Sequence, residues 1–186
     1  MHGYPVSRFF FVVVALIVSA CATGAPESSG SIAVTPDGQS EARGAIVGSF
    51  TQIGKTYVRS ISFRHIASGK RFTIAQGTFL NRNDFKGMID GIGIVFAYDL
   101  PVGDYEFFDY EISYNDGFVS KIWRPQNKFS IPFEVDDGSV KYLGDIRLIP
   151  ARGKNFIGLT IEAGGAFLFA NELERDLPIL RRRFSY

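Results

Sequence analysis

The residues of this sequence with the clearest capacity for chemistry are four closely spaced carboxylates, Asp104, Glu106, Asp109 and Glu111, followed by Asp116. No basic residue lies between them. Carboxylates on one exposed face can bind a cation such as calcium or a basic partner, and two carboxylates across a cleft can hydrolyse a glycosidic bond. The EF-hand loop pattern is absent, and a solvated strand face explains the same residues. We therefore treat the first four as candidate binding residues and assign no catalytic pair.

Trp123, the only tryptophan, is flanked by Lys121 and Arg124. An aromatic ring beside two cations can form a binding surface for a sugar or for peptidoglycan. The alternative is an indole packed into the core, because aromatic side chains are large apolar groups that sandwiches commonly bury. Trp123 is accordingly a further candidate binding residue.

Other catalytic constellations are missing from the sequence. His65 is the only histidine after the first twenty residues, so a typical zinc site would lack a second histidine and a Ser-His-Asp triad would depend on His65 alone. The chain has no Gly-x-Ser-x-Gly elbow, and Gly87–Gly93 lacks both the Walker lysine and the dinucleotide-binding spacing. We expect a protein without enzymatic activity, cofactor or metal.

Cys21 is the only cysteine, and it closes the run Val18-Ser19-Ala20-Cys21 behind the apolar stretch Phe9–Val18. That stretch forms about 15 Å of helix, half of the roughly 30 Å hydrocarbon core, and is too short to span a membrane. With Arg8 before it, the segment has the organisation of a signal peptide. Its end resembles the lipobox of bacterial lipoproteins, which implies acylation of Cys21 and removal of residues 1–20. The alternative is an ordinary secretory signal that happens to contain a cysteine.

The lipobox resemblance implies an address in the cell envelope. Acyl chains on Cys21 would hold the protein on a membrane, at about 0.8 kcal/mol per buried CH₂ group. Ala22 stands where an aspartate favours the inner membrane in Gram-negative lipoproteins, which implies the outer membrane facing the periplasm. Because Arg8 is the only charged side chain in residues 1–20, the 20 basic residues of the chain fall to 19, equal to the 19 acidic ones. This balance argues against a nucleic-acid partner.

Composition divides the rest of the chain into two parts. Residues 21–43 are rich in Gly, Ser, Ala, Pro and Thr, which predicts a flexible tether behind the lipidated cysteine. Residues 44–186 are rich in β-branched and aromatic residues, and their length suits one domain with its own core. Strand-like runs recur about every ten residues, which predicts an all-β fold, an antiparallel β-sandwich. The predicted strands are Ala45–Thr51, Thr56–His65, Arg71–Gln76, Ile92–Tyr98, Asp104–Ser113, Phe118–Trp123, Lys128–Val135, Ser139–Leu148, Asn155–Glu162 and Gly165–Ala170.

Two local patterns refine the strand prediction. Polarity alternates over Phe129–Val135 and Asp136-Asp137-Gly138 offers turn chemistry, which predicts a hairpin with the strand beginning near Val140. Pro132 cannot donate a ladder hydrogen bond, so this strand is expected at an edge. The alternation changes phase at Phe107–Phe108, which predicts a β-bulge. Such a bulge would turn both phenylalanines and three neighbouring aromatic or aliphatic side chains inward, with the four carboxylates outward.

The C-terminus differs from the preceding segments. Asn171 followed three residues later by Glu174 resembles a capping box and predicts a short C-terminal helix. Arg181–Arg183 would lie at the end of this helix, where the macrodipole favours cations. Four apolar residues at helical spacing are expected to dock on the sheets, and these are Leu173, Leu177, Leu180 and Phe184.

Two stretches resemble a known group of proteins. Leu100-Pro101-Val102-Gly103-Asp104-Tyr105 is similar to a strand entry, and Gly138 with Tyr142-Leu143-Gly144 to a later strand, of an uncharacterised bacterial lipoprotein family with a prealbumin-like or carboxypeptidase-regulatory-like β-sandwich domain. The match covers about a third of the domain. It implies an Ig-like sandwich and no enzymatic activity. The loop Asn81–Gly91 and the C-terminal tail are not accounted for by it.

Three functions are compatible with these observations. The first is a non-catalytic, membrane-anchored lipoprotein that serves as a binding or scaffold module for an envelope protein or for peptidoglycan. The second is an envelope hydrolase that uses two carboxylates, and the third is a carrier of a small apolar ligand held between the sheets. We expect the first, because the sequence offers no catalytic constellation and fold alone does not choose among them.

Overall fold

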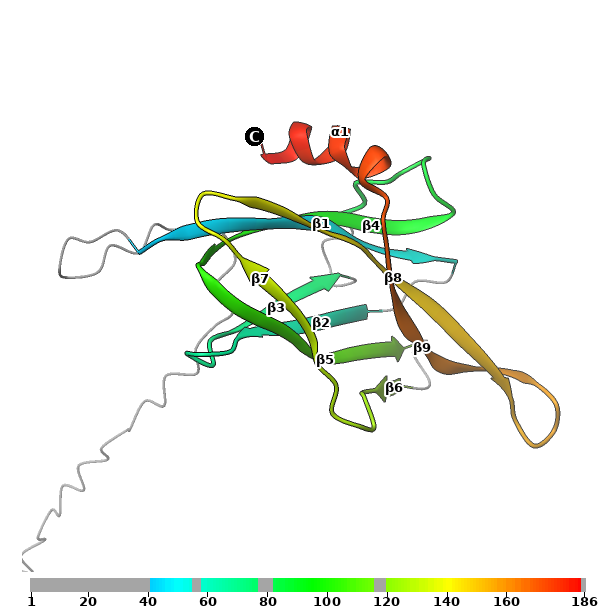
Figure 1. The fold of residues 1–186 in the computed structure, drawn as a ribbon. Helices are drawn as coiled ribbons and strands as arrows, with labels where there is room; N and C mark the ends of the chain where they lie inside the picture. The colour runs from blue at the N-terminus through cyan, green and yellow to red at the C-terminus, as the bar shows by residue number, and fades with distance from the viewer. Residues whose placement is uncertain (1–40, 55–57, 77–81, 116–119, 185–186) are drawn as a thin grey trace, which may run out of the picture.

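The computed structural model describes residues 41–54, 58–76, 82–115 and 120–184, which form nine strands and one helix (Figure 1). The strands form two sheets whose inner faces share one apolar core. The first sheet has the strand order β4-β1-β8-β9, and the second has the order β3-β2-β5-β6, with β7 pairing with the other half of β5. The elements are β1 Arg43–Ile53, β2 Val58–His65, β3 Arg71–Gln76, β4 Gly91–Pro101, β5 Gly103–Asn115, β6 Ser120–Trp123, β7 Ile131–Val135, β8 Val140–Lys154, β9 Thr160–Ala170 and α1 Leu173–Phe184.

Aromatic side chains fill the space between the sheets. Phe63 is fully buried and its ring lies 5.0 Å from that of Phe72, 5.4 Å from that of Tyr98 and 5.7 Å from that of Phe133. These partners come from strands of both sheets, so the packing joins the two layers. Burying each such ring stabilises the fold by about 1.5–3 kcal/mol. The all-β prediction is confirmed, and the core lies where the alternating apolar residues of the strands meet.

The outer face of the first sheet is also covered. Strand β1 therefore buries side chains on both faces, with Phe50 toward the second sheet and Val47 toward the outside. Helix α1 lies across this outer face in Figure 1, and its Ile179 and Leu180 pack with Val47 and with Phe85 from the 82–90 segment. The first sheet thus has a second, smaller apolar cluster beneath the helix.

One strand pairing departs from the predicted antiparallel arrangement. Strands β1 and β8 are parallel, with Ala45 opposite Val140 and Gln52 opposite Leu148, whereas every other pairing among the described strands is antiparallel. The physical reason is the chain path. Parallel neighbours need a crossover, and here the chain visits the second sheet several times between β1 and β8.

The predicted hairpin between Phe129–Val135 and the strand from Val140 is wrong. Strand β7 pairs with β5 in the second sheet, whereas β8 pairs with β1 and β9 in the first. Residues 136–139 do form a turn, in which Gly138 has a positive φ of 63° and donates its N–H to Arg43. The turn carries the chain from one sheet to the other, and local turn chemistry does not specify which sheet the next strand joins. Pro132 lies on a strand whose only described partner is β5, as an edge position requires.

The predicted bulge in β5 is confirmed, with one side chain placed differently. Ser62 lies opposite Asp109 and Phe63 opposite Phe107, so Phe108 is the extra residue. The side chain of Phe108 lies beneath the guanidinium groups of Arg64 and Arg71, at 4.9 and 5.1 Å from its ring centroid. Phe108 therefore belongs to the outer face, because cation–π contacts with these arginines stabilise it there.

The last two predicted strands differ in their boundaries from those observed in the structure. The first eight predicted strands each overlap an observed one, and Arg71–Gln76 coincides with β3. The prediction of a strand over Asn155–Glu162 is wrong for residues 155–159, which form the turn between β8 and β9, whereas residues 160–162 begin β9. Strand β9 then runs without a break from Thr160 to Ala170. The turn contains several apolar residues, which in the sequence are typical of a strand.

The C-terminal helix is present as predicted. Asn171 accepts a hydrogen bond from the N–H of Leu173 through its side-chain oxygen at 3.3 Å, as a capping residue does. Ile179 and Leu180 are buried together with Asp176, whereas Leu173 is 40% exposed. The docking face is therefore rotated from the predicted leucine row. Its position is set by Asp176, which binds polar groups of the sheet.

Candidate functional site

The four candidate carboxylates lie along the outer face of β5. They stand opposite polar or charged residues of the neighbouring strands, with Asp109 facing Ser62. Their spacing places Asp104 and Glu106 at one end of the strand and Glu111 near the other. The structure therefore spreads these residues along a strand, and within its described residues it brings no three of the His, Cys, Asp and Glu side chains together as a metal site.

Glu106 is held by two partners. It accepts hydrogen bonds from Arg64 Nε at 2.7 Å and Nη2 at 2.5 Å, and one from the hydroxyl of Ser130. The hydrogen bond from Ser130, and then those from Arg64, lower the pKa of Glu106 below its usual value. The charged form is thus favoured, and the residue acts as an ion-pair partner on the sheet surface.

The other end of β5 brings Glu111 near Trp123. Ile112 lies opposite Trp123 in the ladder between β5 and β6. Arg124, the next residue, donates to Glu111 Oε2 from Nη2 at 2.6 Å and from Nε at 3.0 Å. Glu111 and Trp123 are thus joined through Arg124.

Trp123 lines a hollow of about 460 Å³ at the edge of the two sheets, which we name the Trp123 groove. Its walls come from β5, from β6 with the segment that follows it, and from β9, and the lining residues are Tyr110, Trp123, Arg124, Pro125, Gln126, Asn127, Phe129, Ala163, Gly164 and Gly165. None of these residues is acidic. The groove is a surface depression and is open to solvent on one side.

Gly164 sets the position of the indole. Its φ is 89°, and a Cβ atom there would lie 2.9 Å from Trp123 Cγ. The missing side chain therefore lets the backbone of β9 approach the ring closely. Trp123 also packs with Ile112 and Leu148, so it is half-buried and fixed.

The groove combines two kinds of group. Tyr110 and Phe129 provide aromatic surface, with their ring centroids 6.0 Å apart. Gln126 and Asn127 provide exposed amides, and Arg124 provides a guanidinium whose side chain is 65% exposed. Such a mixture suits a polar ligand with apolar faces, such as a sugar, because the rings cover its faces and the amides bond its hydroxyl groups.

A second hollow, of about 360 Å³, lies beside the start of α1 and is also open. It is lined by Tyr142, Leu143, Gly144, Phe169, Ala170, Asn171 and Leu173. It has no charged side chain in its lining. The apolar walls and the absence of a convergent polar set make it a weaker candidate than the Trp123 groove.

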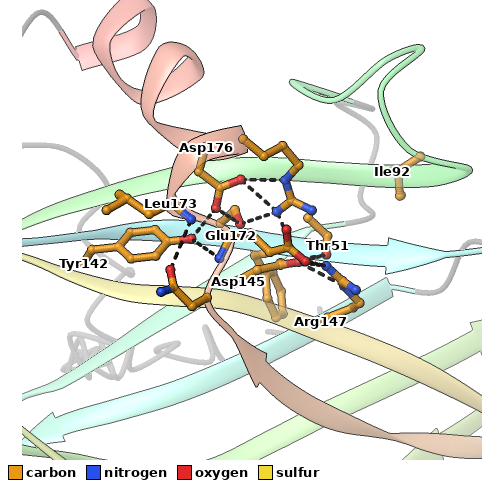
Figure 2. Close-up of polar contacts among 12 residues, drawn as sticks. Thr51, Ile92, Tyr142, Asp145, Arg147, Glu172, Leu173 and Asp176 are labelled. Carbon is orange, nitrogen blue, oxygen red and sulfur yellow. Dashed lines mark hydrogen bonds and ion pairs between the residues drawn. The ribbon is translucent and has the colours of Figure 1, made fainter.

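A network of buried charges joins α1 to the first sheet, and sequence reasoning missed it (Figure 2). Asp145 and Asp176 are both fully buried. Arg175 bridges them, at 3.2 Å from Asp145 and 2.8 Å from Asp176. Arg147 contacts Asp145 at 2.8 Å and Glu172 at 2.7 Å. Buried charges are stable only when paired, so each carboxylate here has its counter-ion.

Hydroxyl groups complete this network. Asp176 accepts from Ser49 at 2.5 Å and from Tyr142 at 2.7 Å, and Asp145 accepts from Thr51 at 2.7 Å. Burial, and then the hydrogen bond to Asp176, raise the pKa of the Tyr142 hydroxyl. The network is shielded from solvent by the helix, so its role is to fix α1. A sequence signal existed in Ser49 and Thr51, which are polar residues inside an apolar strand.

A second buried cation lies between the sheets. Arg59 is 1% exposed and donates to Gln52 at 3.1 Å, to Gln76 at 2.5 Å and to the Phe50 carbonyl at 3.1 Å. Burial lowers the pKa of Arg59 to about 9. Among the described residues its acceptors are neutral and its Nε atom has no partner. It joins the sheets through hydrogen bonds, and neither of the two hollows reaches it.

The imidazole ring of His65 is packed against neighbouring residues. Its Nδ1 lies 2.8 Å from the Ser68 hydroxyl, and its ring centroid lies 4.9 Å from that of Tyr105. A Cβ atom on Gly103 would lie 2.5 Å from Nε2, so the ring is packed against the backbone. His65 therefore covers the edge of the core.

The fold and the groove define a mostly β protein with two sheets, a C-terminal helix and one mixed aromatic and polar depression. No helix in the described part of the chain is long and apolar enough to cross a membrane. The predictions for residues 1–20 and for Cys21 concern a part of the chain outside the described residues.

Comparison with known proteins does not narrow this class further. The sequence matches no protein-family model, and no curated protein matches it. A leucine-rich repeat protein from Bacteroides thetaiotaomicron superposes with a TM-score of 0.34 and 10% sequence identity, over 59% of this chain and 14% of that chain. This chain thus spans a small part of that protein, and so low a score carries no argument about function.

Proposed function

We propose that this protein is a non-catalytic binding module of the bacterial cell envelope, anchored through a lipid on Cys21 and facing the periplasm from the outer membrane. Its domain is a sandwich of the prealbumin-like or Ig-like kind. Its ligand site is the Trp123 groove, and the ligand is a sugar-containing envelope polymer such as peptidoglycan. The observation that carries this proposal is the joining of aromatic rings, amides and one exposed guanidinium in that groove.

The distribution of charges favours binding over hydrolysis. Hydrolysis of a glycosidic bond needs two carboxyl groups facing each other across a cleft. Neither hollow described here is lined by an acidic residue, and Glu106 and Glu111 are paired with Arg64 and Arg124 on a sheet surface. A carrier of an apolar molecule would need an enclosed cavity, whereas both hollows are open.

The groove contains its own reporter. Trp123 is the only tryptophan of the chain, so its fluorescence reports on this site alone. We expect soluble peptidoglycan fragments to change its emission in a saturable way, since a sugar ring that approaches the indole replaces water there. Separation of the fragments by chromatography after incubation should show them intact.

Two variants, each lacking one positive charge, test whether the ligand binds in the Trp123 groove. Arg124→Gln removes the guanidinium at the groove, and Lys86→Gln removes an exposed cation in the 82–90 segment next to α1. We expect the first variant to weaken binding about tenfold or more, because hydrogen bonds from charged groups contribute about 1.5–3 kcal/mol. The second should bind as the parent chain does. Emission that does not respond to any fragment, or cleavage of the fragments, would overturn the proposal.

A further inference from the structure

The strands β8 and β9 continue well beyond the rest of the first sheet. The last described pairing of β8 with β1 is Gln52 with Leu148, after which residues 149–154 pair with β9 alone. We name residues 152–162 the β8–β9 arm. In Figure 1 it projects away from the two sheets and ends in a bare turn. An isolated two-stranded ribbon gains little stability by itself, so its length calls for another explanation.

The tip of this arm carries three large apolar side chains in solvent. Phe156 is 99% exposed, Ile157 is 62% exposed and Leu159 is 60% exposed. They occupy the turn itself, where polar residues, Gly and Pro are the rule. Three neighbouring exposed apolar residues at the outermost point of a molecule indicate a surface that is covered when the protein works.

Four backbone N–H groups of the tip are hydrogen-bonded within the turn. Asn155 donates its N–H to the Leu159 carbonyl at 2.9 Å, and Gly158 donates to the Asn155 carbonyl at 2.9 Å. The side-chain oxygen of Asn155 accepts the N–H groups of Ile157 at 3.1 Å and Leu159 at 2.9 Å. A protein partner could supply such bonds, but the acyl region of a bilayer cannot. These bonds lower the cost of moving the tip out of water.

Cations lie directly behind the tip. Lys154 and Arg152 precede Phe156 by two and four residues, which is about 7 and 13 Å at 3.3 Å per residue. Both side chains are exposed, and among the described residues neither has an ion-pair partner. Insertion of apolar side chains by 5–10 Å places groups at that distance among lipid headgroups. The arm carries one acidic residue, Glu162, so its charge is complementary to an anionic surface.

We propose that the tip of the β8–β9 arm inserts into the interface of an anionic lipid bilayer, with Phe156, Ile157 and Leu159 among the acyl chains and Lys154 and Arg152 at the headgroups. The arm is then a membrane contact independent of any lipid on Cys21. This inference does not depend on a ligand in the Trp123 groove.

The test places a fluorescent reporter at the tip of the full chain. Phe156→Trp combined with Trp123→Phe leaves one tryptophan, at position 156, where the side chain touches nothing that a larger ring would disturb. The chain is reconstituted into vesicles of phosphatidylethanolamine and phosphatidylglycerol, with or without bromine on the acyl chains. We expect the reporter at position 156 to emit at a shorter wavelength with these vesicles than in buffer without lipid. We also expect the brominated lipid to quench this emission.

Matched variants separate the possible outcomes. Met88→Trp with Trp123→Phe places the same reporter at an exposed apolar site, 54% accessible, on the 82–90 segment next to α1. This control should remain accessible to a water-soluble quencher. Changing Arg152 or Lys154 to Gln should lower the ratio of inserted to free tip by about fivefold for each cation. Vesicles of phosphatidylcholine alone should lower it as well.

Three results would overturn the proposal. The first is a reporter at position 156 that stays exposed to water on anionic vesicles. The second is a shift that depends on protein density and is not quenched by brominated lipid, because a second copy of the chain would then cover the tip. The third is equal quenching at position 88, which would mean that the whole domain lies on the membrane without a specific contact.

Discussion

Asp176 is the residue on which the attachment of α1 depends most. Its carboxylate is fully buried and accepts hydrogen bonds from Ser49, Tyr142 and Arg175, at 2.5, 2.7 and 2.8 Å. Replacing it by Ala leaves two hydroxyl groups and one side of a guanidinium without their acceptor in a site that excludes water. Breaking a buried charged pair by removing one partner costs about 3–5 kcal/mol. We expect the free energy of unfolding of Asp176→Ala to fall by that amount.

The measurement is urea denaturation of the purified chain, followed by circular dichroism. Glu174→Ala is the matched control, because Glu174 lies in the same first helical turn but is exposed. Both substitutions remove a favourable interaction with the helix dipole of about 0.3–1 kcal/mol, so their difference isolates the buried contacts. A cycle with Tyr142→Phe should give a coupling energy of about 0.5–3 kcal/mol with Asp176.

Proteolysis distinguishes local undocking of α1 from unfolding of the whole domain. Arg181–Arg183 offer trypsin sites at the exposed end of α1, and undocking should speed cleavage there. The network does not hold α1 if the free energy of unfolding of Asp176→Ala lies within about 1 kcal/mol of that of Glu174→Ala and trypsin cleaves the two variants at the same rate. That result would mean that the apolar contacts of Ile179 and Leu180 hold the helix without the network.

Three further outcomes are expected. Gly164→Ala should destabilise the protein by about 1–3 kcal/mol in urea and shift Trp123 emission, because its Cβ would lie 2.9 Å from the indole at a φ of 89°; unchanged emission would contradict the packing. The pKa of Arg59 in the folded chain, about 9, lies below the ordinary value for arginine, so above pH 9 the unfolded state binds more protons and stability should rise with pH, by up to about 1.4 kcal/mol per pH unit relative to Arg59→Met. Parallel pH profiles of the two proteins would contradict this. Phe108→Ser should cost about 1 kcal/mol or less, since it removes exposed cation–π contacts with Arg64 and Arg71; a loss typical of a core phenylalanine would place Phe108 inside.

Short-range patterns in the sequence were sufficient for most of the elements. The alternation of polarity located the strands, and the phase change at Phe107–Phe108 located the bulge, because a bulge is a local change in which two residues oppose one. The cap at Asn171 located the start of the C-terminal helix, since its side chain bonds a backbone group two residues away. These features depend on residues that are close together in the chain, so they can be recognised in the sequence.

Pairings between distant segments required the tertiary structure. The turn at residues 136–139 has the same local chemistry whether it makes a hairpin or crosses between sheets, and only the packing of β8 beside β1 distinguishes the two. The same holds for Asp145 and Asp176, which are 31 residues apart in the sequence numbering and meet through Arg175.

The Trp123 groove shows both contributions at one site. The sequence alone indicated Trp123 and Arg124 as candidates, because an aromatic residue beside a cation is visible in a single strand. Tertiary structure added Gly164 from β9, whose missing side chain makes room for the indole, and it separated Glu106 from the groove by placing it at the other end of β5. Residue type and local periodicity are properties of the chain, whereas burial, ion pairing and the walls of a groove are properties of surfaces that meet only when the chain is folded.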